Sequence, residues 1–513
     1  MRDGNIALDS DKDSVIITVN GIEHNFDRGI YLSEVHSMHK PCGGHGKCGK
    51  CKVYASGALS PITGTEQELL TKEELSAGVR LACLTVAEGD CRVDSIRDRG
   101  GDMILTEGEL PEIAIDPAFS KYGVAFDIGT TTLAARLYNT SAELLASAAR
   151  LNPQSRWGAD VISRIEAAIG GEAEEIAMAI RAAIDDMILE LASAADLDPK
   201  EIDHAVVTGN TVMLSLFSGV SVEPFSHAPF EAPELFGRCF DANELGIKSM
   251  AERGRIYFPP CIQAFVGADT TCALLATGIG GSGETLMLAD VGTNGEMAIY
   301  NNGELTVCST AAGPAFEGVG ISMGMRCADG AIDKVAVEDG KIVAHTVNGA
   351  PPCGICGSAL VDAAACMLSL EILDESGYLE DEILEIFHPV YINQKDIRML
   401  QLAKSAICAG LCTLVKSCGV SYDAVKHLYV AGGFGSYLSK KNASDIGLLP
   451  KKLAEVTVAV GNAALTGASM LLLSKSVMRD CERLVSGARV LDLSTDKTFS
   501  EYYISGMMLC EVE

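Results

Sequence analysis

Residues 122–138 read YGVAFDIGTTTLAARLY, and residues 286–303 read LMLADVGTNGEMAIYNNG. Each stretch passes from an apolar strand through an Asp, a hydrophobe, a Gly and a Thr into a second strand. In a tight hairpin of this kind the glycine removes a side-chain obstacle, so that backbone N–H groups and hydroxyls can face a phosphate. A single copy would more often be an ordinary turn. Two copies in matching contexts predict a pair of phosphate-binding hairpins.

The two aspartates, Asp127 and Asp290, stand near the ends of the first strands of these hairpins. A carboxylate in this position is suited to hold Mg²⁺ through water, because Mg²⁺ gives up its hydration shell reluctantly. We therefore predict that both aspartates act in catalysis. The predicted phosphate-binding residues are Gly129, Thr130, Thr131 and Thr132 in the first hairpin, and Gly292, Thr293, Asn294, Gly295 and Glu296 in the second.

A third element, HLYVAGGFGSYLSKKNASDIGLLP at residues 427–450, contains an apolar strand that runs into Gly432, Gly433, Phe434 and Gly435. Glycines at a strand-to-helix turn allow close approach of a ring or ribose, although a sharp turn alone would have the same composition. The position of this element after the two hairpins favours a nucleotide site. The sequence has neither a P-loop nor a G-x-G-x-x-G motif after a first strand, which argues against those nucleotide folds.

A cysteine-rich loop, PCGGHGKCGKCKV, occupies residues 41–53. Its Cys42, Cys48 and Cys51, together with Cys83 on a later predicted strand, are close to the plant-type ligand spacing of 2Fe-2S clusters. The glycines of the loop would adopt positive φ and let the backbone wrap closely round such a cluster. Zinc is an alternative metal, and His45 is a rival ligand. We predict one 2Fe-2S cluster held by the four cysteines.

The sequence around this loop predicts a small mixed sheet. Residues 14–26, SVIITVNGIEHNF, alternate apolar and polar on both sides of Asn20-Gly21, a strong hairpin signal. IYLSEVHSMHK predicts a helix, KVYA a strand, and CLTVAEGDCRVDSI two strands around Glu88-Gly89, with Cys91 packed on one of them. This order is typical of a β-grasp fold.

The predicted class of the whole chain is α/β, with three parts. Residues 1–97 form the ferredoxin-type domain, and residues 98–120, which are charged and lack periodicity, form a linker. From residue 121 short apolar strands alternate with alanine-rich helices such as EAEEIAMAIRAAIDDMILELASAA. We expect residues 121–275 and 276–513 to be the first and second lobes of a larger domain.

Composition excludes several classes of protein. The 513 residues carry a formal charge of -29, which argues against a nucleic-acid or anionic-membrane partner. The polar N-terminus and the lack of an uninterrupted apolar run of about 18 residues predict a cytoplasmic protein without a membrane span. Many of the 18 cysteines lie in apolar helical stretches, where packing in the core is expected, and their number suggests a reducing or anaerobic setting.

The two hairpins and the glycine turn resemble the ATP site of the acetate kinase, sugar kinase, Hsp70 and actin superfamily. In that resemblance DIGTTT and DVGTNGE are the phosphate motifs and VAGGFG is the adenosine motif, so the two lobes would be an ATPase domain that uses Mg²⁺. FPPCIQAFVGADTTCALLATG and VGNAALTGASMLLL look like its connecting helices. The resemblance implies that Gln263 lies near the attacking water, with a capping or packing role as the alternative.

A plant-type ferredoxin domain ahead of such an ATPase resembles the reductive activators of corrinoid enzymes. LNPQSRWGADVISRI, VTGNTVMLSLFSG, CSTAAGPAFEGVGISMGM, ICGSALVDA and LAKSAICAGL carry this resemblance. It implies that the 2Fe-2S cluster passes one electron to Co(II) of a corrinoid protein in a methyltransferase system, with ATP turnover coupled to the transfer. A reductase, ferredoxin or flavodoxin would supply the electron, and a homodimer is compatible with the family.

The chain departs from the family pattern in two places. The short linker is expected to leave no room for an additional middle domain, and the C-terminal 4Fe-4S motif of members that serve methylamine systems is missing. Two alternative functions stay open, namely an activator of the 2-hydroxyacyl-CoA dehydratase type and a redox-sensing ATPase or chaperone. Arg156, Trp157 and Asp160 lie on a predicted turn before a helix, where the only tryptophan of the chain would dock a partner or pack in the core.

Overall fold

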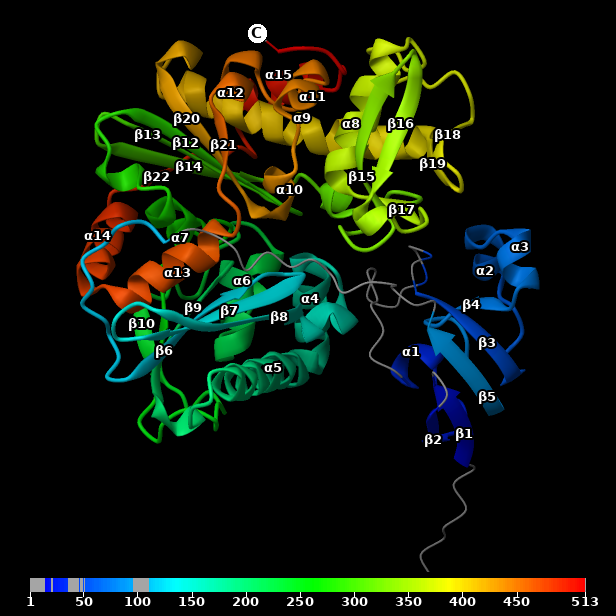
Figure 1. Cartoon of the computed structure of the whole chain (residues 1–513), viewed down its shortest axis with the longest axis horizontal. Helices are drawn as coiled ribbons and strands as arrows, with labels where there is room; N and C mark the ends of the chain where they lie inside the picture. Colours follow the sequence, from blue (N-terminus) through cyan, green and yellow to red (C-terminus); the bar gives the residue numbers. More distant parts are fainter. Residues whose placement is uncertain are drawn as a thin grey trace, which may run out of the picture. The chain divides into compact units, whose positions relative to one another are not determined.

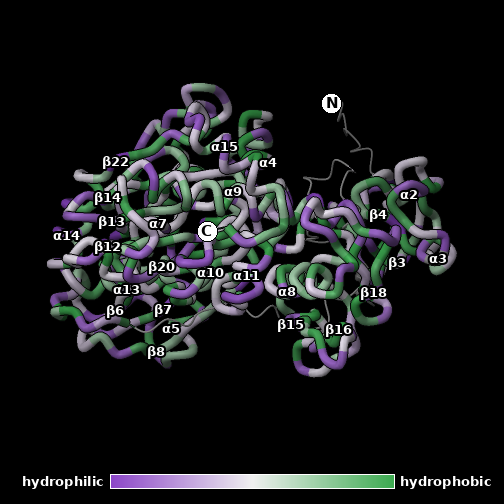
Figure 2. The backbone as a smooth tube through the Cα atoms, turned by 90° about the horizontal axis from the view of Figure 1, so that it is seen from above, coloured by the Kyte–Doolittle hydropathy of each residue, from purple (hydrophilic) through white to green (hydrophobic). Residues whose placement is uncertain are grey.

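The computed structural model describes residues 14–19, 22–35, 46, 49, 51–95 and 110–512. The chain forms two compact units. The N-terminal unit contains Met1–Asp98 together with the segment Pro153–Ala159, and the C-terminal unit contains Arg99–Asn152 and Asp160–Glu513. Hydrophobic and hydrophilic residues are interspersed along both units (Figure 2).

The N-terminal unit is built on a five-stranded mixed sheet with the order β2-β1-β5-β3-β4 (Figure 1). Strands β1 and β2 form an antiparallel hairpin in which Val19 pairs with Ile22, while β1 runs parallel to β5. The hairpin, the helix and the further strands follow one another along the chain as predicted for a β-grasp fold. The elements are β1 (Ser14–Val19), β2 (Ile22–Asp27), α1 (Leu32–Val35), β3 (Lys52–Leu59), α2 (Gly64–Leu69), α3 (Lys72–Ser76), β4 (Val79–Leu81) and β5 (Ala87–Ser95).

The prediction of two strands around Glu88-Gly89 is wrong. Strand β5 is continuous from Ala87 to Ser95, and Cys83 lies in a turn after β4 rather than on a strand. The N–H groups of Leu84 and Thr85 both donate to the carbonyl of Leu81, which closes this turn. Cys91 is buried on β5 as expected.

The C-terminal unit contains two six-stranded sheets, ordered β10-β11-β9-β6-β7-β8 and β21-β20-β12-β13-β14-β22. The first sheet is formed by β6 (Tyr122–Ile128), β7 (Thr132–Asn139), β8 (Leu144–Leu151), β9 (Ile202–Gly209), β10 (Arg238–Asp241) and β11 (Arg255–Phe258). The second is formed by β12 (Thr285–Val291), β13 (Gly295–Asn301), β14 (Glu304–Thr310), β20 (Val425–Ala431), β21 (Thr457–Ala459) and β22 (Arg489–Val490).

The two sheets repeat one pattern of connections. In each sheet a strand bearing an aspartate pairs antiparallel with the next strand and parallel with a later one, β6 with β7 and β9, and β12 with β13 and β20. Asp127 and Asp290 occupy the same place, one residue before the strand ends. The similarity of the two hairpins therefore extends to the parallel strand that follows each of them, β9 and β20.

Two helices lie between the sheets (Figure 1), α7 (Ala268–Ala276) and α13 (Ala463–Leu473). Helix α13 follows β21 of the second sheet in the chain but packs Leu465 and Leu471 into the core beneath the first sheet. Helix α7 follows the first sheet and contributes Leu274 to the core beneath the second. The helices approach so closely that a Cβ at Gly467 would lie 1.9 Å from the carbonyl oxygen of Cys272.

The outer faces of the sheets are covered by two long helices, α5 (Ala173–Ala194) and α9 (Gln394–Ser417) (Figure 1). Helix α9 is long and apolar enough to cross a membrane by length and composition, but 83% of its apolar window is buried inside the protein, as in a core helix. The remaining helices are α4 (Val161–Ala167), α6 (Thr211–Ser218), α8 (Gly357–Ser369), α10 (Gly432–Ser436), α11 (Lys440–Asp445), α12 (Lys451–Glu455), α14 (Lys475–Ser486) and α15 (Lys497–Ser505).

A smaller subdomain branches from the second lobe. It contains a three-stranded sheet, ordered β16-β15-β17, and the β18–β19 hairpin. Its strands are β15 (Ala331–Glu338), β16 (Lys341–Thr346), β17 (Gly354–Ile355), β18 (Ile383–Phe387) and β19 (Val390–Asn393). Part of the expected linker, residues 110–120, is anchored on the C-terminal unit, since the Asp116 and Ala118 N–H groups donate to carbonyls of Leu473 and Leu472.

Candidate functional site

Both aspartate hairpins open onto one cavity of about 350 Å³ in the C-terminal unit. The glycine turn at α10 and the N-terminal ends of α7 and α13 complete its wall. The predicted site residues that line the cavity are Asp127, Gly129, Thr130, Thr131, Thr132, Asp290, Gly292, Thr293, Asn294, Glu296, Gly432, Gly433 and Phe434. Three motifs that are far apart in the sequence therefore form a single site.

Carboxylates are concentrated at the floor of this cavity. Burial raises the pKa values of Asp127, Asp269 and Asp290 to about 7, and the neighbouring carboxylates add to the effect. Burial and the same like charges also raise the pKa of Glu296, which stands opposite Asp290 in the β12–β13 ladder. Groups that share a site in this way ionise together only when a cation neutralises them. The charge and chemistry of this oxygen donor set fit hydrated Mg²⁺.

Two buried residues, Asn152 and Arg164, donate hydrogen bonds to the backbone of the first hairpin turn. The side-chain N–H of Asn152 donates to the Gly129 carbonyl at 2.8 Å, and its backbone N–H donates to the Thr131 carbonyl at 2.9 Å. The guanidinium of Arg164 donates to the Thr130 carbonyl. Since all three carbonyls of the turn are engaged by these two buried residues, its shape is fixed before any ligand arrives.

The second hairpin turn is hydrogen-bonded to a carboxylate of the protein itself, that of Glu317. Glu317 accepts hydrogen bonds from the Thr293 backbone N–H at 3.1 Å and from the Thr293 hydroxyl at 2.9 Å. Burial raises the pKa of Glu317, while Thr293, Arg326 and Arg164 oppose that rise. A carboxylate thus occupies donors that the sequence assigns to a phosphate.

The two interlobe helices each bring a polar residue into the cavity. Asn462 caps α13, with its side-chain oxygen accepting from the Leu465 N–H, and its side-chain N–H donates to Asp127 at 3.0 Å. Asp269 lies in the first turn of α7 and lines the cavity between the two hairpins. These residues link the second lobe to the first carboxylate and place a further carboxylate at the centre.

The cavity has an aromatic side as well. The rings of Phe316 and Phe434 stack with centroids 4.4 Å apart, and Tyr437 and Met325 line the same space. Gly432 has φ +84° and lies beside Asp290, where a Cβ would be 3.2 Å from the carboxylate oxygen. A pocket with apolar rings near donors and carboxylates suits a ligand with a flat ring and phosphates.

Three predicted residues are not brought into the cavity lining. Gln263 has an exposed side chain and forms a small bridge with Val266, and its backbone carbonyl accepts from the Thr211 hydroxyl at 2.9 Å. Gly295 and Gly435 are required by packing, because a Cβ would lie 2.3 Å from Ile407 and 2.6 Å from Val430, respectively. Sequence reasoning missed Asp269, Asn462, Glu317 and Arg164, although the first two stand at the start of apolar helices that were recognised.

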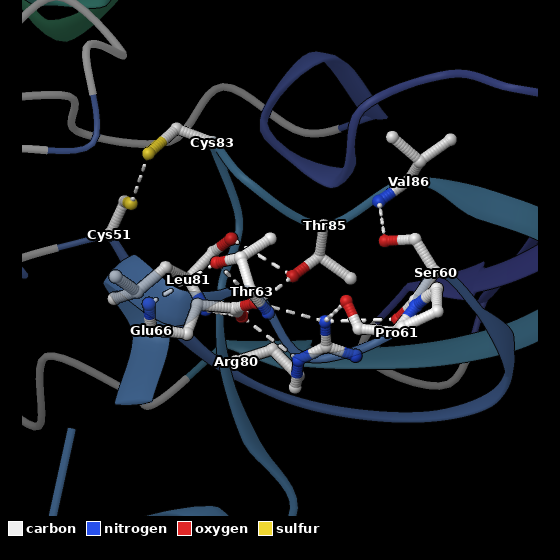
Figure 3. A network of polar contacts seen from close by, with 10 residues as sticks. All are labelled: Cys51, Ser60, Pro61, Thr63, Glu66, Arg80, Leu81, Cys83, Thr85 and Val86. Carbon is white, nitrogen blue, oxygen red and sulfur yellow. Dashed lines mark hydrogen bonds and ion pairs between the residues drawn. The ribbon is translucent and has the colours of Figure 1, made fainter. Parts of the chain in front are cut away.

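Two predicted cluster ligands converge in the N-terminal unit. The Sγ atoms of Cys51 and Cys83 lie 3.1 Å apart, and both residues are buried (Figure 3). Gly46 and Gly49 have φ of +67° and +63°, as predicted for a loop that wraps round a cluster. Cys42, Cys48 and His45 lie outside the described residues. Among the described residues no group of three or more Cys, His, Asp or Glu side chains forms a metal site by itself.

A buried ion pair supports the turn that carries Cys83. Glu66 accepts from the guanidinium of Arg80 at 2.9 Å, from the Leu81 N–H at 3.1 Å and from the Thr85 hydroxyl at 3.2 Å (Figure 3). Burial alone would raise the pKa of Glu66, but the hydrogen bonds from Arg80, Thr63 and Leu81 outweigh it and lower the pKa to about 2. Glu66 therefore remains ionised and holds both ends of the turn.

The fold and the cavity define a two-lobed protein with an ATPase-like domain. Comparison with known families agrees: a model described as the C-terminal domain of RACo, the ASKHA domain, matches residues 284–513, and one described as the RACo middle region matches residues 122–282. The corrinoid activation enzyme RamQ of Eubacterium limosum is 36% identical over 427 residues, which are 75% of this chain and 70% of that protein.

Two further relatives extend the match. The Co(II) methylated amine-specific corrinoid protein reductase of Methanosarcina barkeri is 27% identical over 423 residues, 76% of each protein. A solved structure of a reductive activator for a corrinoid, iron-sulfur protein superposes with a TM-score of 0.71 at 28% identity, over 97% of this chain and 98% of that one. The chain belongs to the family of reductive activators of corrinoid proteins.

The comparison corrects one expectation about domain organisation. The family's middle region is present, and it coincides with the segment that was expected to be the first ATPase lobe. The short linker was expected to leave no room for this region, whereas the region forms the first six-stranded sheet and contributes Asp127, the first hairpin turn and Asp269 to the cavity wall.

Proposed function

We propose that this protein is an ATP-dependent enzyme that transfers one electron from an N-terminal 2Fe-2S cluster to Co(II) of an inactivated corrinoid protein, restoring Co(I) for methyl transfer. The observation that carries the proposal is the convergence of two aspartate hairpins on one cavity in a chain of the corrinoid activator family. The printed functions of the two relatives, corrinoid activation and reduction of a Co(II) corrinoid protein, support the choice of partner.

In this proposal the two hairpin turns bind the phosphates of ATP. Asp127 and Asp290 hold the water shell of Mg²⁺, which when bound neutralises charge on the phosphates. Asp269 lies between them in the cavity, and we assign it the role of orienting the attacking water. Phe316 and Phe434 contact the base. Asn462 belongs to the second lobe and donates to Asp127, so a change at the first hairpin would be transmitted to the second lobe through this hydrogen bond.

The N-terminal unit would hold the cluster through Cys42, Cys48, Cys51 and Cys83. A 2Fe-2S cluster supplies single electrons, and the paired buried thiols of Cys51 and Cys83 fit two of its ligand positions. A cytoplasmic reductase, ferredoxin or flavodoxin would deliver the electron. Differential affinity of the nucleotide states for the docked corrinoid protein would couple ATP turnover to the transfer.

Cluster content is the first test. The protein is purified without oxygen, and iron, acid-labile sulfide and zinc are measured beside the EPR spectrum of the reduced protein. We expect two irons and two sulfides per chain in the wild type, loss of both in Cys83→Ser, and retention in Cys91→Ser, which changes a buried cysteine on β5 of the same unit. Zinc without sulfide would exclude electron transfer from this unit.

Activation is the second test. A corrinoid protein encoded with a methyltransferase is oxidised to Co(II), and its absorbance is followed after addition of reduced protein with and without Mg-ATP. We expect Co(I) to form only with ATP, and Asp290→Asn to abolish its formation while the cluster stays intact. ATP hydrolysis that responds to cluster oxidation but never yields Co(I) would favour the redox-sensing ATPase instead.

A further inference from the structure

The cavity of the C-terminal unit carries strongly unbalanced charge. Five of its described lining residues have carboxyl side chains, and Arg326 is the only described one with a cationic side chain. Hydrolysis of ATP shifts negative charge onto the departing ADP, so a cation beside the phosphates acts directly on the rate. Arg326 therefore lies where a positive charge can stabilise the reaction.

The charge of Arg326 acts on the carboxylate that occupies a phosphate position. Glu317 accepts from the N–H and the hydroxyl of Thr293, which lies in the second hairpin turn. Burial raises the pKa of Glu317, whereas its hydrogen bond with Thr293 and the positive charge of Arg326 oppose that rise. Glu317 and Arg326 both line the cavity. A phosphate that displaces Glu317 from Thr293 would therefore enter the field of the guanidinium.

Glu317 and Arg326 stand at the two ends of one tightly closed loop. A Cβ at Gly318, whose φ is +78°, would lie 2.6 Å from the backbone nitrogen of Met325. A Cβ at Gly324 would lie 2.2 Å from the carbonyl oxygen of Gly318. The two ends of the loop therefore approach as closely as only glycine permits, which keeps Glu317 and Arg326 together.

Hydrogen bonds to two other elements fix this loop. The Met325 N–H donates to the carbonyl of Ile355 on β17 at 2.9 Å. In the middle of the loop the Ser322 N–H donates to the carboxylate of Asp396, in the first turn of α9, at 2.7 Å. Because this backbone is held before any nucleotide binds, little conformational entropy is lost in placing the guanidinium of Arg326.

We propose that Arg326 is a catalytic residue whose guanidinium binds the terminal phosphate of ATP at the second hairpin turn and stabilises the negative charge that develops during hydrolysis. The inference rests on the proposed function, because it takes the cavity to be an ATP site. A guanidinium suits this role, since its planar fork donates two parallel hydrogen bonds to phosphate oxygens and stays protonated. In the nucleotide-free protein Glu317 holds the place of that phosphate.

The reaction in this scheme consumes one water. The water oxygen bonds to the γ-phosphorus while the bond from that phosphorus to the bridging oxygen breaks, and the bridging oxygen keeps the electron pair as ADP leaves. One proton of the water passes to Asp269, which orients it, and from there to solvent. The other proton stays on inorganic phosphate. Arg326 gains no bond and no proton, so its contribution is electrostatic.

The experiment compares turnover with nucleotide affinity in the full-length protein. Steady-state hydrolysis gives kcat, and calorimetry gives the affinity for Mg-ADP with and without fluoroaluminate, which mimics the phosphoryl group during transfer. We expect Arg326→Ala to lower kcat by about 100-fold or more and to lose most of the affinity that fluoroaluminate adds in the wild type. The affinity for Mg-ADP alone should change by less than about threefold, because the guanidinium acts chiefly in the transition state.

The chain offers a matched control in Arg398→Gln. Arg398 belongs to α9 in the same lobe, donates to the Ser376 carbonyl at 2.8 Å and is not part of the cavity lining. This variant should keep the kcat and the fluoroaluminate effect of the wild type. Free guanidinium ion added to Arg326→Ala should restore part of the lost turnover, whereas added sodium chloride at equal ionic strength should not.

Either of two results would overturn the inference: a wild-type kcat in Arg326→Ala, or equal losses of Mg-ADP affinity with and without fluoroaluminate, which would mean that Arg326 only shapes the site. If Arg326→Ala does not fold, Arg326→Lys decides the question, because it keeps the charge and loses the planar fork. Its kcat should then fall by about tenfold or more, and a wild-type kcat contradicts the role. Failure of the wild type to bind Mg-ATP would overturn the proposed ATP site itself, so the two failures are distinguishable.

Discussion

The carboxylate of Glu317 accepts hydrogen bonds from both the backbone N–H and the hydroxyl of Thr293, at 3.1 Å and 2.9 Å. Thr293 lies in the turn that we assign to a phosphate of ATP. In the nucleotide-free protein a side chain therefore occupies the donors that the ligand requires. An incoming phosphate must therefore displace Glu317 from Thr293.

Removing the charge of Glu317 should change nucleotide affinity. Because the carboxylate competes with the phosphate, we expect Glu317→Gln to bind nucleotide about tenfold more tightly, the free energy of one charge-assisted hydrogen bond. Thr293→Val should bind more weakly, while Thr285→Val, at the far end of β12, should match the wild type. Calorimetry measures all three, and weaker binding in Glu317→Gln would show that the carboxylate serves the cation instead.

The buried carboxylates make stability depend on pH. Asp127, Asp269 and Asp290 have pKa values of about 7, whereas an unfolded Asp ionises near pH 4. Between these values the native state holds more protons than the unfolded state, so these groups lower stability as pH rises and reach their full penalty above about pH 7. We expect Asp290→Asn to melt at a higher temperature than the wild type at about pH 8, with a smaller difference near pH 5. An equal difference in melting temperature between Asp290→Asn and the wild type at both pH values would contradict the raised pKa of Asp290.

Catalysis should depend on Asp269 and not on Gln263. The structure places Asp269 in the cavity and leaves the Gln263 side chain exposed outside its lining. We expect Asp269→Asn to lower ATP hydrolysis by about 100-fold or more, and Gln263→Ala to change it by less than about threefold. Steady-state hydrolysis at saturating Mg-ATP checks both, and the reverse order would restore the role that the superfamily resemblance gave to Gln263.

The ion pair of Glu66 and Arg80 should set the stability of the N-terminal unit. Glu66→Gln leaves Arg80 buried with a weaker partner, so we expect a loss on the order of 3 kcal/mol. The pKa of Glu66 is lowered to about 2, so its stabilisation is complete above about pH 4.5 and is lost as the pH falls toward 2. Chemical unfolding monitored by the visible absorbance of the proposed cluster measures this loss. Lys52→Met, which removes a half-buried pair with Glu74, is the control and should change stability less.

Local features of the site could be predicted from sequence, and long-range ones could not. Each of the Asp127 and Asp290 hairpins lies within fewer than 20 consecutive residues. An apolar strand followed by an Asp, a Gly and a second strand is therefore enough to recognise it. The hydrogen bond from Asn462 to Asp127 spans 335 residues and exists only because α13 crosses to the first lobe. Cys83 was expected on a strand because its neighbours favour strands, but two N–H groups that share the Leu81 carbonyl close a turn there.

The exchange of α7 and α13 between the lobes has a consequence for how the chain can be divided. The two family matches meet near residue 283, yet a polypeptide cut there would separate the first sheet from Leu465, Leu471 and their neighbours on α13. Each half would expose an apolar surface that only the other half covers, so neither fragment should be soluble when expressed by itself. Residues 122–282 and 284–513 should therefore fold only as parts of one polypeptide. We expect recombination between relatives to keep the two regions together.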